Sequence, residues 1–338
     1  MLRVMVVGLG TMGGVHAASF AAMDDAELSA VVDVREERAN KAHEKYGAQA
    51  FTSFEQAVEE LGSELDVISI CLPTDLHPEY VKKAADLNVA IICEKPLART
   101  LKAAEEMIAY CEQKEVSLYV GHVVRFFPEY QKAKQAIDEG AIGTVGVVRT
   151  TRGGSYPVAT EDWYANTDRS GGLVLDLMVH DFDFLRWCFG DAERVYAKNM
   201  AGVSGVNEQR KDYALVTIRF KNGVIAHLEG TWAHEGFRTS FEIAGRDGII
   251  QYDSQKNQAL VAEKASTDGK PGVAVPESPL KHSPYALELA HFIDCIKNGA
   301  EPIVTADDAY KAVEMAMAAL QSAEENRPVA IESQTVEL

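Results

Sequence analysis

A glycine-rich turn near the start of the chain constrains its fold more than any other feature. Residues 2–7 are apolar and predict a buried strand, and a helix is expected at about residues 12–23. Between them Gly8, Gly10 and Gly13 form the pattern G-x-G-x-x-G. The first glycine permits a tight turn, the second lets a pyrophosphate approach the backbone, and the third lets the helix pack on the strand. The turn therefore predicts a dinucleotide site with the phosphates at the helix N-terminus.

An acidic residue at the end of the second expected strand narrows the choice of dinucleotide. This strand covers residues 28–32 and is followed by Asp33, twenty residues after Gly13. A carboxylate at this offset accepts hydrogen bonds from the ribose hydroxyls and repels a 2′-phosphate. The pattern favours NAD, and NADP is kept as a weaker alternative because Arg35 and Arg38 follow closely.

Strands and helices continue to alternate as far as residue 121. Alternation of this kind implies parallel βαβ units with right-handed crossovers. His77 follows an expected strand end, where a nicotinamide would lie, although a surface residue that starts a helix is an equally good interpretation. The expected strands are residues 66–71, 89–93 and 117–121, and the expected helices are residues 36–46, 78–87 and 101–113.

Lys95 follows the carboxyl end of the strand at residues 89–93. Pro96 disfavours helical backbone at Lys95 and keeps it extended. Ligands of open α/β sheets bind at the carboxyl ends of the strands, and lysine is rarely buried without a partner. On position alone, a ligand-binding lysine and a solvated loop lysine are equally good interpretations. The residues expected to contact the cofactor are Gly8, Gly10, Thr11, Met12, Gly13, Asp33, Val34, Arg35, Leu72, Pro73, Thr74, His77, Glu94 and Lys95.

The second half of the chain has a different pattern, in which turns join strands directly. The sequences at residues 221–223 and 246–248 end in Asn-Gly and Asp-Gly, which are strong hairpin signals. Hairpins make an antiparallel sheet, so this half is predicted to be α+β. Thr305 is a good N-cap and Gly299 a good C-terminal stop for two late helices, which either cover a face of the sheet or return to the first domain. The expected strands are residues 145–152, 213–220, 224–232, 240–244 and 249–252, the expected helices are residues 128–139, 285–298 and 306–326, and residues 266–279 are expected to be a loop.

A carboxylate and an imidazole occur together in an otherwise apolar segment of the second half. If residues 171–183 form one helix, Asp176 and His180 are four positions apart and share a face, with Asp183 one turn further. The carboxylate can then orient the ring or raise its basicity. An ordinary hydrogen-bonded pair in the core is the better interpretation when these residues are taken without Lys95 and the glycine turn.

Together, these motifs resemble the Gfo/Idh/MocA oxidoreductase family. The resemblance rests on the glycine turn, on Glu94-Lys95-Pro96, and on the Gly-Gly pair at residues 171–172 followed by Asp176, His180 and Asp183. Residues 121–128 also resemble the segment that joins the family's two domains. The match spans the chain in motif order. It implies an α/β Rossmann domain at residues 1–121 and an α+β domain at residues 122–338, with a large, open, mostly antiparallel sheet.

The resemblance also implies a reaction. His180 would be the general base on a secondary alcohol of a cyclitol (myo- or scyllo-inositol type) or of a pyranose sugar. Lys95 would hold the alcohol oxygen, Asp176 would position substrate and ring, and hydride would pass to NAD. Two alternatives are a redox-neutral, NAD-using glycosidase or sugar oxidoreductase with tightly bound cofactor, and a non-enzymatic NAD-binding regulator. The regulator is expected to lack the acid–base residues, which this chain retains.

Several other residues are interpreted as lining the substrate pocket. Trp163 and Tyr164 lie just before the Gly-Gly pair, and aromatic faces suit sugars, although two aromatic rings packed under a loop are an equally good interpretation. Trp232 and His234 end a strand and face either the pocket or a partner subunit. The expected substrate-binding residues are Lys95, Arg125, Trp163, Tyr164, Asp176 and His180.

Composition limits the remaining function classes. A chain of 338 residues suits two domains, and a net charge of −18 argues against nucleic acid and anionic membranes as partners and favours a neutral polyol. The five scattered cysteines indicate reduced thiols of a cytoplasmic protein and no metal site. The uncharged stretch after Arg3 contains the glycine turn, so we do not expect it to be a signal peptide. An exposed sheet face predicts a homodimer or homotetramer.

Overall fold

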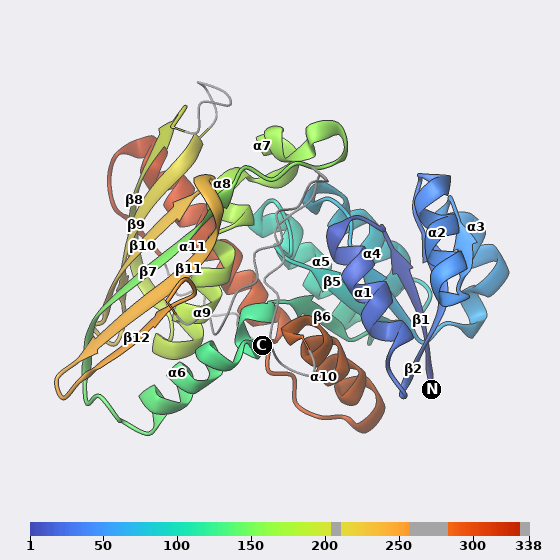
Figure 1. The fold of residues 1–338 in the computed structure, drawn as a ribbon, viewed down its shortest axis with the longest axis horizontal. Helices are drawn as coiled ribbons and strands as arrows, with labels where there is room; N and C mark the ends of the chain where they lie inside the picture. Colours follow the sequence, from blue (N-terminus) through green and yellow to red (C-terminus); the bar gives the residue numbers. More distant parts are fainter. Residues whose placement is uncertain (204–210, 257–282, 332–338) are drawn as a thin grey trace. The chain divides into compact units, whose positions relative to one another are not determined.

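The computed structural model describes residues 1–203, 211–256 and 283–331, so the loop expected at residues 266–279 lies outside the described part. The chain forms two compact units, each with its own sheet (Figure 1). The first comprises Met1–Phe127 with Glu277–Tyr310, and the second comprises Pro128–Pro276 with Lys311–Leu338.

The first unit is built on a parallel sheet of six strands in the order β3-β2-β1-β4-β5-β6. The order reverses between β1 and β4, and open α/β sheets bind ligands at such a point, outside the carboxyl ends of the strands. All four residues of β4 are buried, as expected for the centre of a parallel sheet. The strands are β1 (Leu2–Val7), β2 (Ala26–Val32), β3 (Gln49–Phe51), β4 (Val67–Ile70), β5 (Ala90–Glu94) and β6 (Leu118–Gly121).

Helices connect these strands, and local sequence signals set several of their ends. The side chains of Ser53 and Thr100 cap the first turns of α3 and α5, and Gly47 ends α2 with a φ of 78°. The helices are α1 (Thr11–Ala21), α2 (Glu36–Tyr46), α3 (Phe54–Leu61), α4 (His77–Ala85) and α5 (Leu101–Gln113), with the 3₁₀ turns η1 (Gly62–Glu64), η2 (Thr74–Leu76) and η3 (Val123–Phe126).

A helix from late in the chain, α10 (Pro284–Asn298), completes the first unit beside α1 (Figure 1). Leu289 and Phe292 of α10 share a buried core with Val4 and Phe20. Gly299 ends the helix in the left-handed conformation, as predicted. Because α10 buries its apolar side here, the division of the chain differs from the single boundary expected between residues 121 and 122.

The second unit contains a sheet of seven strands in the order β12-β11-β7-β10-β9-β8-β13. Its strand pairs are antiparallel except for β7 with β10. Both predicted hairpins are confirmed: residues 221–224 join β9 to β10, and residues 246–248 join β11 to β12. The strands are β7 (Val145–Ser155), β8 (Ala192–Ala201), β9 (Lys211–Phe220), β10 (Ile225–Thr231), β11 (Ala233–Gly245), β12 (Ile249–Asp253) and β13 (Val329–Ala330).

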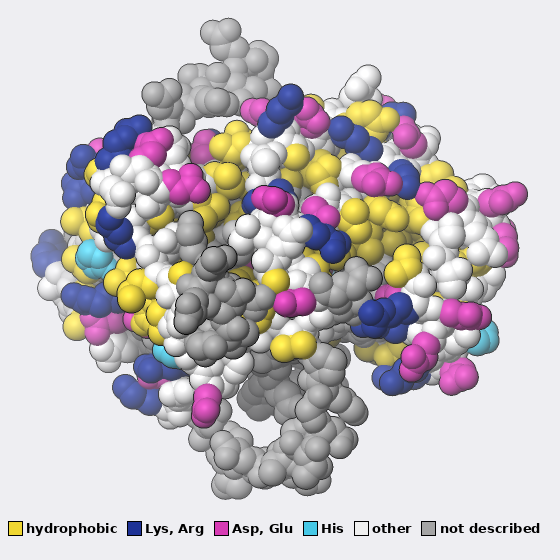
Figure 2. All heavy atoms as spheres, turned by 90° about the horizontal axis from the view of Figure 1, so that it is seen from above, with side chains coloured by type: hydrophobic (Ala, Val, Ile, Leu, Met, Phe, Trp, Pro, Cys, Tyr) yellow, Lys and Arg dark blue, Asp and Glu magenta, His cyan; other side chains and the backbone are white. Residues whose placement is uncertain are grey.

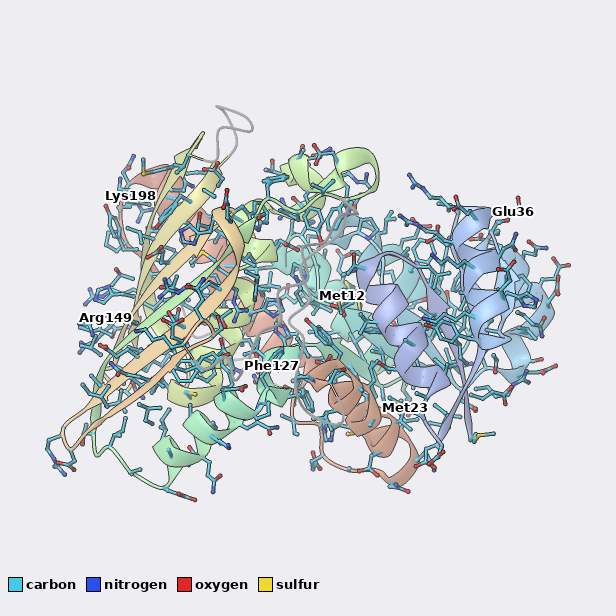
Figure 3. The ribbon with its side chains drawn as sticks, viewed as in Figure 1. Met12, Met23, Glu36, Phe127, Arg149 and Lys198 are labelled. Carbon is cyan, nitrogen blue, oxygen red and sulfur yellow. The ribbon has the colours of Figure 1, made fainter. Side chains whose placement is uncertain are left out.

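The two faces of this sheet differ in burial. On β9, Val216 is 2% exposed and its neighbour Leu215 is 56% exposed. Figure 1 shows α6 and α9 on one side of the sheet, and Figure 3 shows Arg149 and Lys198 on the other, which we call the outer sheet face. The helices of this unit are α6 (Pro128–Asp138), α7 (Thr167–Ser170), α8 (Gly172–Asp176), α9 (Val179–Phe189) and most of α11 (Ala306–Glu325), with the 3₁₀ turn η4 (Thr160–Ala165). The Thr305 side chain caps α11, as predicted.

Candidate functional site

The glycine turn closes tightly on itself and on the end of β4. A Cβ atom at Gly13 would lie 1.7 Å from the Gly8 carbonyl oxygen, and one at Gly8, whose φ is +88°, would lie 2.5 Å from the Cys71 carbonyl oxygen. A Cβ at Gly10 would meet nothing within 4 Å. The outer two glycines are therefore required by packing, whereas the middle one borders open space. Thr11 and Met12 follow Gly10 and begin α1, and Figure 3 shows Met12 at this end of the helix.

The Asp33 carboxylate is fixed beside this turn by main-chain hydrogen bonds. Leu9 N–H donates to its Oδ2 at 2.8 Å, and Arg35 N–H donates to its Oδ1 at 2.9 Å. Nη1 of Arg38 lies 3.7 Å from Oδ2. The next residue, Val34, is 86% exposed. These groups fit NAD, because Gly10 leaves room for its phosphates and the carboxylate oxygens keep lone pairs for ribose hydroxyls.

His77 is an internal link between two loops at the carboxyl ends of the strands. Its side chain is fully buried, with Nε2 3.0 Å from the Leu72 carbonyl oxygen and Nδ1 3.0 Å from the Pro96 carbonyl oxygen. Burial lowers the pKa of His77 despite these carbonyl groups. The interpretation of His77 as a surface residue is therefore wrong. The expected contacts of His77, Leu72, Pro73 and Thr74 with the cofactor stay predictions.

Lys95 directly follows β5 and is half-buried, and the peptide bond to Pro96 is cis. Its main-chain N–H donates to Oε2 of Glu94 at 3.1 Å. Glu94 is 6% exposed, and its Oε1 lies 3.0 Å from Nε2 of His16 in α1. His16 was not among the residues predicted from the sequence, and its signal is a histidine about one helical turn after Gly13. Such a position points from α1 toward the sheet.

The segment expected to be one helix over residues 171–183 consists of two helices, so this prediction is wrong. α8 ends at Asp176 and α9 begins at Val179. At the break, the Met178 N–H reaches back five residues to the Leu173 carbonyl oxygen. The physical reason is packing: Met178 fills the space over Gly230, where a Cβ atom would lie 2.5 Å from the methionine sulfur. Asp176 is 7% exposed and His180 is half-buried.

A buried ion pair fixes the first turn of α9 to the sheet. Nε of Arg152 in β7 lies 2.7 Å from Oδ2 of Asp181, and both side chains are buried. Arg152 also donates to the Tyr130 hydroxyl at 3.3 Å. Burial raises the pKa of Asp181, although the Arg152 charge opposes the shift. The pair holds the residue next to His180, and sequence reasoning missed it because Arg152 and Asp181 are far apart in the chain.

The aromatic residues expected to bind substrate form part of a larger cluster. The rings of Trp163 and Tyr164 stack at 4.0 Å, and Tyr164 meets Trp232 edge-on at 6.3 Å. The Tyr156 ring also contacts Trp232 edge-on, with the two ring centroids 5.2 Å apart. Trp232 is only 4% exposed, whereas Trp163 and Tyr164 are half-buried. The stacked pair can therefore offer aromatic surface, and the buried Trp232 contacts Tyr164 edge-on.

Arg125 has internal partners in the first unit. It is 2% exposed, and its Nη1 donates to the Ile303 carbonyl oxygen at 2.7 Å and to Oδ2 of Asp308 at 3.2 Å. These contacts join η3 to the start of α11 and indicate a structural role. They give no support to the expected place of Arg125 in the substrate pocket.

The described part of the chain lacks the features of membrane-spanning and metal-binding proteins. In that part, no helix is both long and apolar enough to cross a bilayer, and no three His, Cys, Asp or Glu side chains are grouped to hold a metal ion. All five cysteines are thiols. On the face in Figure 2, acidic and basic side chains are interspersed.

Comparisons with known proteins cover nearly the whole chain. Residues 2–122 match the model of the oxidoreductase family's NAD-binding Rossmann fold, and residues 134–331 match that of its C-terminal alpha/beta domain, both named for Gfo/Idh/MocA. The chain is 31% identical to myo-inositol 2-dehydrogenase of Thermotoga maritima, over 98% of this chain and 99% of the relative. It is 29% identical to the NAD(+)-dependent scyllo-inositol 2-dehydrogenase of Bacillus subtilis, over 98% and 96%. The solved structure of GenD2 from gentamicin A biosynthesis, in complex with NAD, superposes with a TM-score of 0.88 at 26% identity, covering 98% and 97%.

Proposed function

The chain belongs to the Gfo/Idh/MocA oxidoreductase family, and we propose that its substrate is a cyclitol of the myo- or scyllo-inositol type or a pyranose sugar. It is an NAD-dependent oxidoreductase that acts on CH–OH groups. The observation that carries the substrate class is the end-to-end similarity to two inositol dehydrogenases. A net charge of −18 supports a neutral polyol over an anionic substrate.

We propose three residues for the chemistry. His180 accepts the proton of the substrate hydroxyl, because an imidazole can take up and release a proton near neutral pH. The Lys95 ammonium donates a hydrogen bond to the same oxygen and stabilises the negative charge that develops there. Asp176 orients the substrate and the His180 ring. A bound NAD would supply the acceptor for the hydride of this carbon, and the alcohol, on losing a proton and a hydride, would become a ketone.

The stacked pair of Trp163 and Tyr164 is proposed to contact the C–H face of the ring substrate. Stacked aromatic rings present a flat, rigid surface at low entropic cost, which suits a cyclitol or pyranose. Trp232 supports Tyr164 edge-on and keeps the pair in place.

Mixing the purified protein with NAD and a panel of cyclitols and pyranoses tests this proposal by the appearance of NADH absorbance. Turnover on at least one cyclitol or pyranose is expected. Cofactor that copurifies with the protein, together with product formation and no net NADH release, would instead support the redox-neutral alternative. The absence of product with every compound would overturn the proposed substrate class.

We also propose that the protein is a homodimer or homotetramer and that the outer sheet face takes part in its assembly. This face carries exposed apolar side chains among charged ones: Leu215 is 56% exposed and Met200 is 62% exposed. Association would remove this apolar surface from water. The five cysteine thiols favour a reducing compartment, and we propose the cytoplasm.

A further inference from the structure

A buried histidine connects the helix behind the glycine turn to the main chain of Lys95. His16 lies in α1 and is fully buried. Its Nδ1 lies 2.7 Å from the Ser69 hydroxyl oxygen in β4, and its Nε2 lies 3.0 Å from Oε1 of Glu94. The second oxygen of Glu94 accepts the Lys95 N–H at 3.1 Å. A continuous series of hydrogen bonds therefore runs from α1 to Lys95 within the first unit.

The electrostatics of this series favour a charged pair. Burial lowers the pKa of His16, but the Cys71 sulfur and the Glu94 carboxylate outweigh it and raise that pKa well above the ordinary histidine value. Burial raises the pKa of Glu94, but the His16 hydrogen bond and the His16 and Lys95 charges lower it overall. An imidazolium can donate from both ring nitrogens, which matches acceptors at Ser69 and Glu94.

A buried ion pair of this kind adds little net free energy to the stability of the fold. Removing two charges from water costs about as much as their attraction returns, and a buried pair is often replaced by apolar residues without loss. The carboxylate is also confined from the other side, because a Cβ atom at Gly121 would lie only 3.4 Å from it. The geometry thus holds Glu94 in one place, beside the residue to which the proposed function assigns the reacting oxygen.

We infer that His16 is a positioning residue for Lys95, acting through Glu94. Its imidazolium holds the Glu94 carboxylate, which in turn fixes the Lys95 main chain at the end of β5. His16 also gives the carboxylate a positive partner other than the Lys95 ammonium, so that the ammonium is directed to the substrate oxygen. The inference rests on the proposed function, because it assumes that Lys95 contacts the reacting alcohol.

Two substitutions of His16 separate positioning from packing. The amide of His16→Gln can replace Nε2 and keep the hydrogen bond to Glu94, whereas His16→Asn replaces Nδ1 and keeps only the contact with Ser69. We expect His16→Asn to lower kcat about 10- to 100-fold, because small displacements of a catalytic group cost this much. We expect His16→Gln to recover most of this loss, and the Kd for NAD to change less than about threefold in both, since the glycine turn is intact.

Thermal melts of both variants accompany the kinetics, which are measured below the onset of unfolding. His43→Gln is the matched control, because His43 is exposed on α2 and its Nδ1 lies 2.8 Å from the Ala48 carbonyl oxygen, away from Glu94 and Lys95 in the sequence; it is expected to match the wild type. Wild-type kcat in folded His16→Asn, or equal losses of kcat in the asparagine and glutamine variants, would overturn the inference.

Nuclear magnetic resonance gives a readout that does not depend on turnover. In the ¹⁵N-labelled wild type, we expect both His16 ring nitrogens to carry protons at pH 7.5, and the Lys95 amide signal to shift in His16→Asn but not in His43→Gln. An unshifted Lys95 signal refutes the positioning role even if the enzyme is active. Shifted signals in a protein that oxidises no polyol would leave the positioning of Lys95 supported and overturn the proposed substrate.

Discussion

Asp33 is the residue through which the cofactor choice is tested. Replacing it with serine removes the acceptor for the ribose hydroxyls and the negative charge that repels a 2′-phosphate, next to Arg35 and Arg38. A hydrogen bond to a charged group is worth about 1.5–3 kcal/mol, so we expect kcat/KM for NAD to fall about 10- to 100-fold and the ratio of NADP to NAD use to rise.

Steady-state kinetics with both cofactors measure this change, with Asp24→Ser as the control because Asp24 is also acidic and is exposed. An unchanged cofactor ratio in Asp33→Ser would mean that Asp33 does not contact the ribose.

At the residue scale, the spacing of residues in the sequence predicted the conformation of the main chain better than it predicted the partners of side chains. The glycines and Asp33 lie as their spacing requires, because a tight turn and an adjacent strand end are local features. The partners of His16 and Arg125 were not predictable, since each pairs with a residue far away in the chain. The pairing of Arg152 with Asp181 was not predictable for the same reason.

The contact between α1 and the glycine turn permits a sharp comparison of two neighbouring glycines. A methyl group at Gly13 would collide with the Gly8 carbonyl, whereas one at Gly14 meets nothing within 4 Å. Gly13→Ala is expected to destabilise the protein by about 1–3 kcal/mol and to weaken NAD binding. Gly14→Ala is expected to stabilise it by about 0.5–1 kcal/mol, as alanine favours helix. Thermal melts measure the stability of the two variants, and titrations measure their affinity for NAD. Equal changes in Gly13→Ala and Gly14→Ala would contradict the close contact between Gly13 and the Gly8 carbonyl.

The link between α1 and β5 should make stability depend on pH in a defined direction. The raised pKa of His16 contributes stability that is complete below about pH 6.5, the unfolded value, and is lost as the pH rises through the folded value. The lowered pKa of Glu94 contributes stability above about pH 4.3 that is lost as the pH falls. The two contributions therefore overlap between about pH 4.3 and 6.5.

We expect wild type and His16→Asn to differ by about 3–5 kcal/mol in unfolding free energy at pH 6, the usual effect of removing one partner of a buried pair. The difference should shrink as the pH rises and the wild-type ring loses its proton. Denaturant titrations at pH 6 and over a rising series of pH values measure it. A difference that is constant or grows with pH would show that His16 is not the cationic partner of Glu94.

At the element scale, the helices with clear caps were predicted well, and those shaped by tertiary contacts were not. The expected bounds of α2 and α5 agree with the structure because their ends carry local signals such as Gly47 and Thr100. The break between α8 and α9 depends on Met178 packing over Gly230, which no local pattern encodes. Strand β8 was missed because its exposed side carries the apolar residues Tyr196 and Met200, which blur the alternation of polar and apolar side chains.

For the whole molecule, the sequence predicted two domains but did not predict that α10, a helix late in the chain, belongs to the first of them. The apolar side of α10 indicated that the helix is covered, without indicating by which surface, and the choice of α1 depends on side chains more than 260 residues away, such as Phe20 and Leu289. The family-level resemblance is confirmed across both units. The assignment of Lys95, Asp176 and His180 to the chemistry stays a prediction.

Assembly through the outer sheet face is tested with a charged substitution. Leu215→Glu places a carboxylate on this face beside Glu229, its cross-strand neighbour, and we expect it to dissociate the oligomer to subunits of 36.9 kDa. Light scattering measures the mass, with Leu287→Glu as a control on an exposed position of α10. A wild-type protein that is monomeric, or an unchanged mass in Leu215→Glu, would contradict the proposed interface.

Direct transfer of hydride is the central claim, and isotope labelling measures it most directly. The protein would be incubated with NAD and with a polyol that it oxidises, carrying deuterium on its ring carbons, and the NADH formed would be analysed by mass spectrometry. We predict one deuterium in the nicotinamide for the wild type, and product formation at least about 100-fold slower in His180→Ala, with NAD binding retained. Reduced cofactor that contains no deuterium, or wild-type turnover in His180→Ala, would contradict the mechanism.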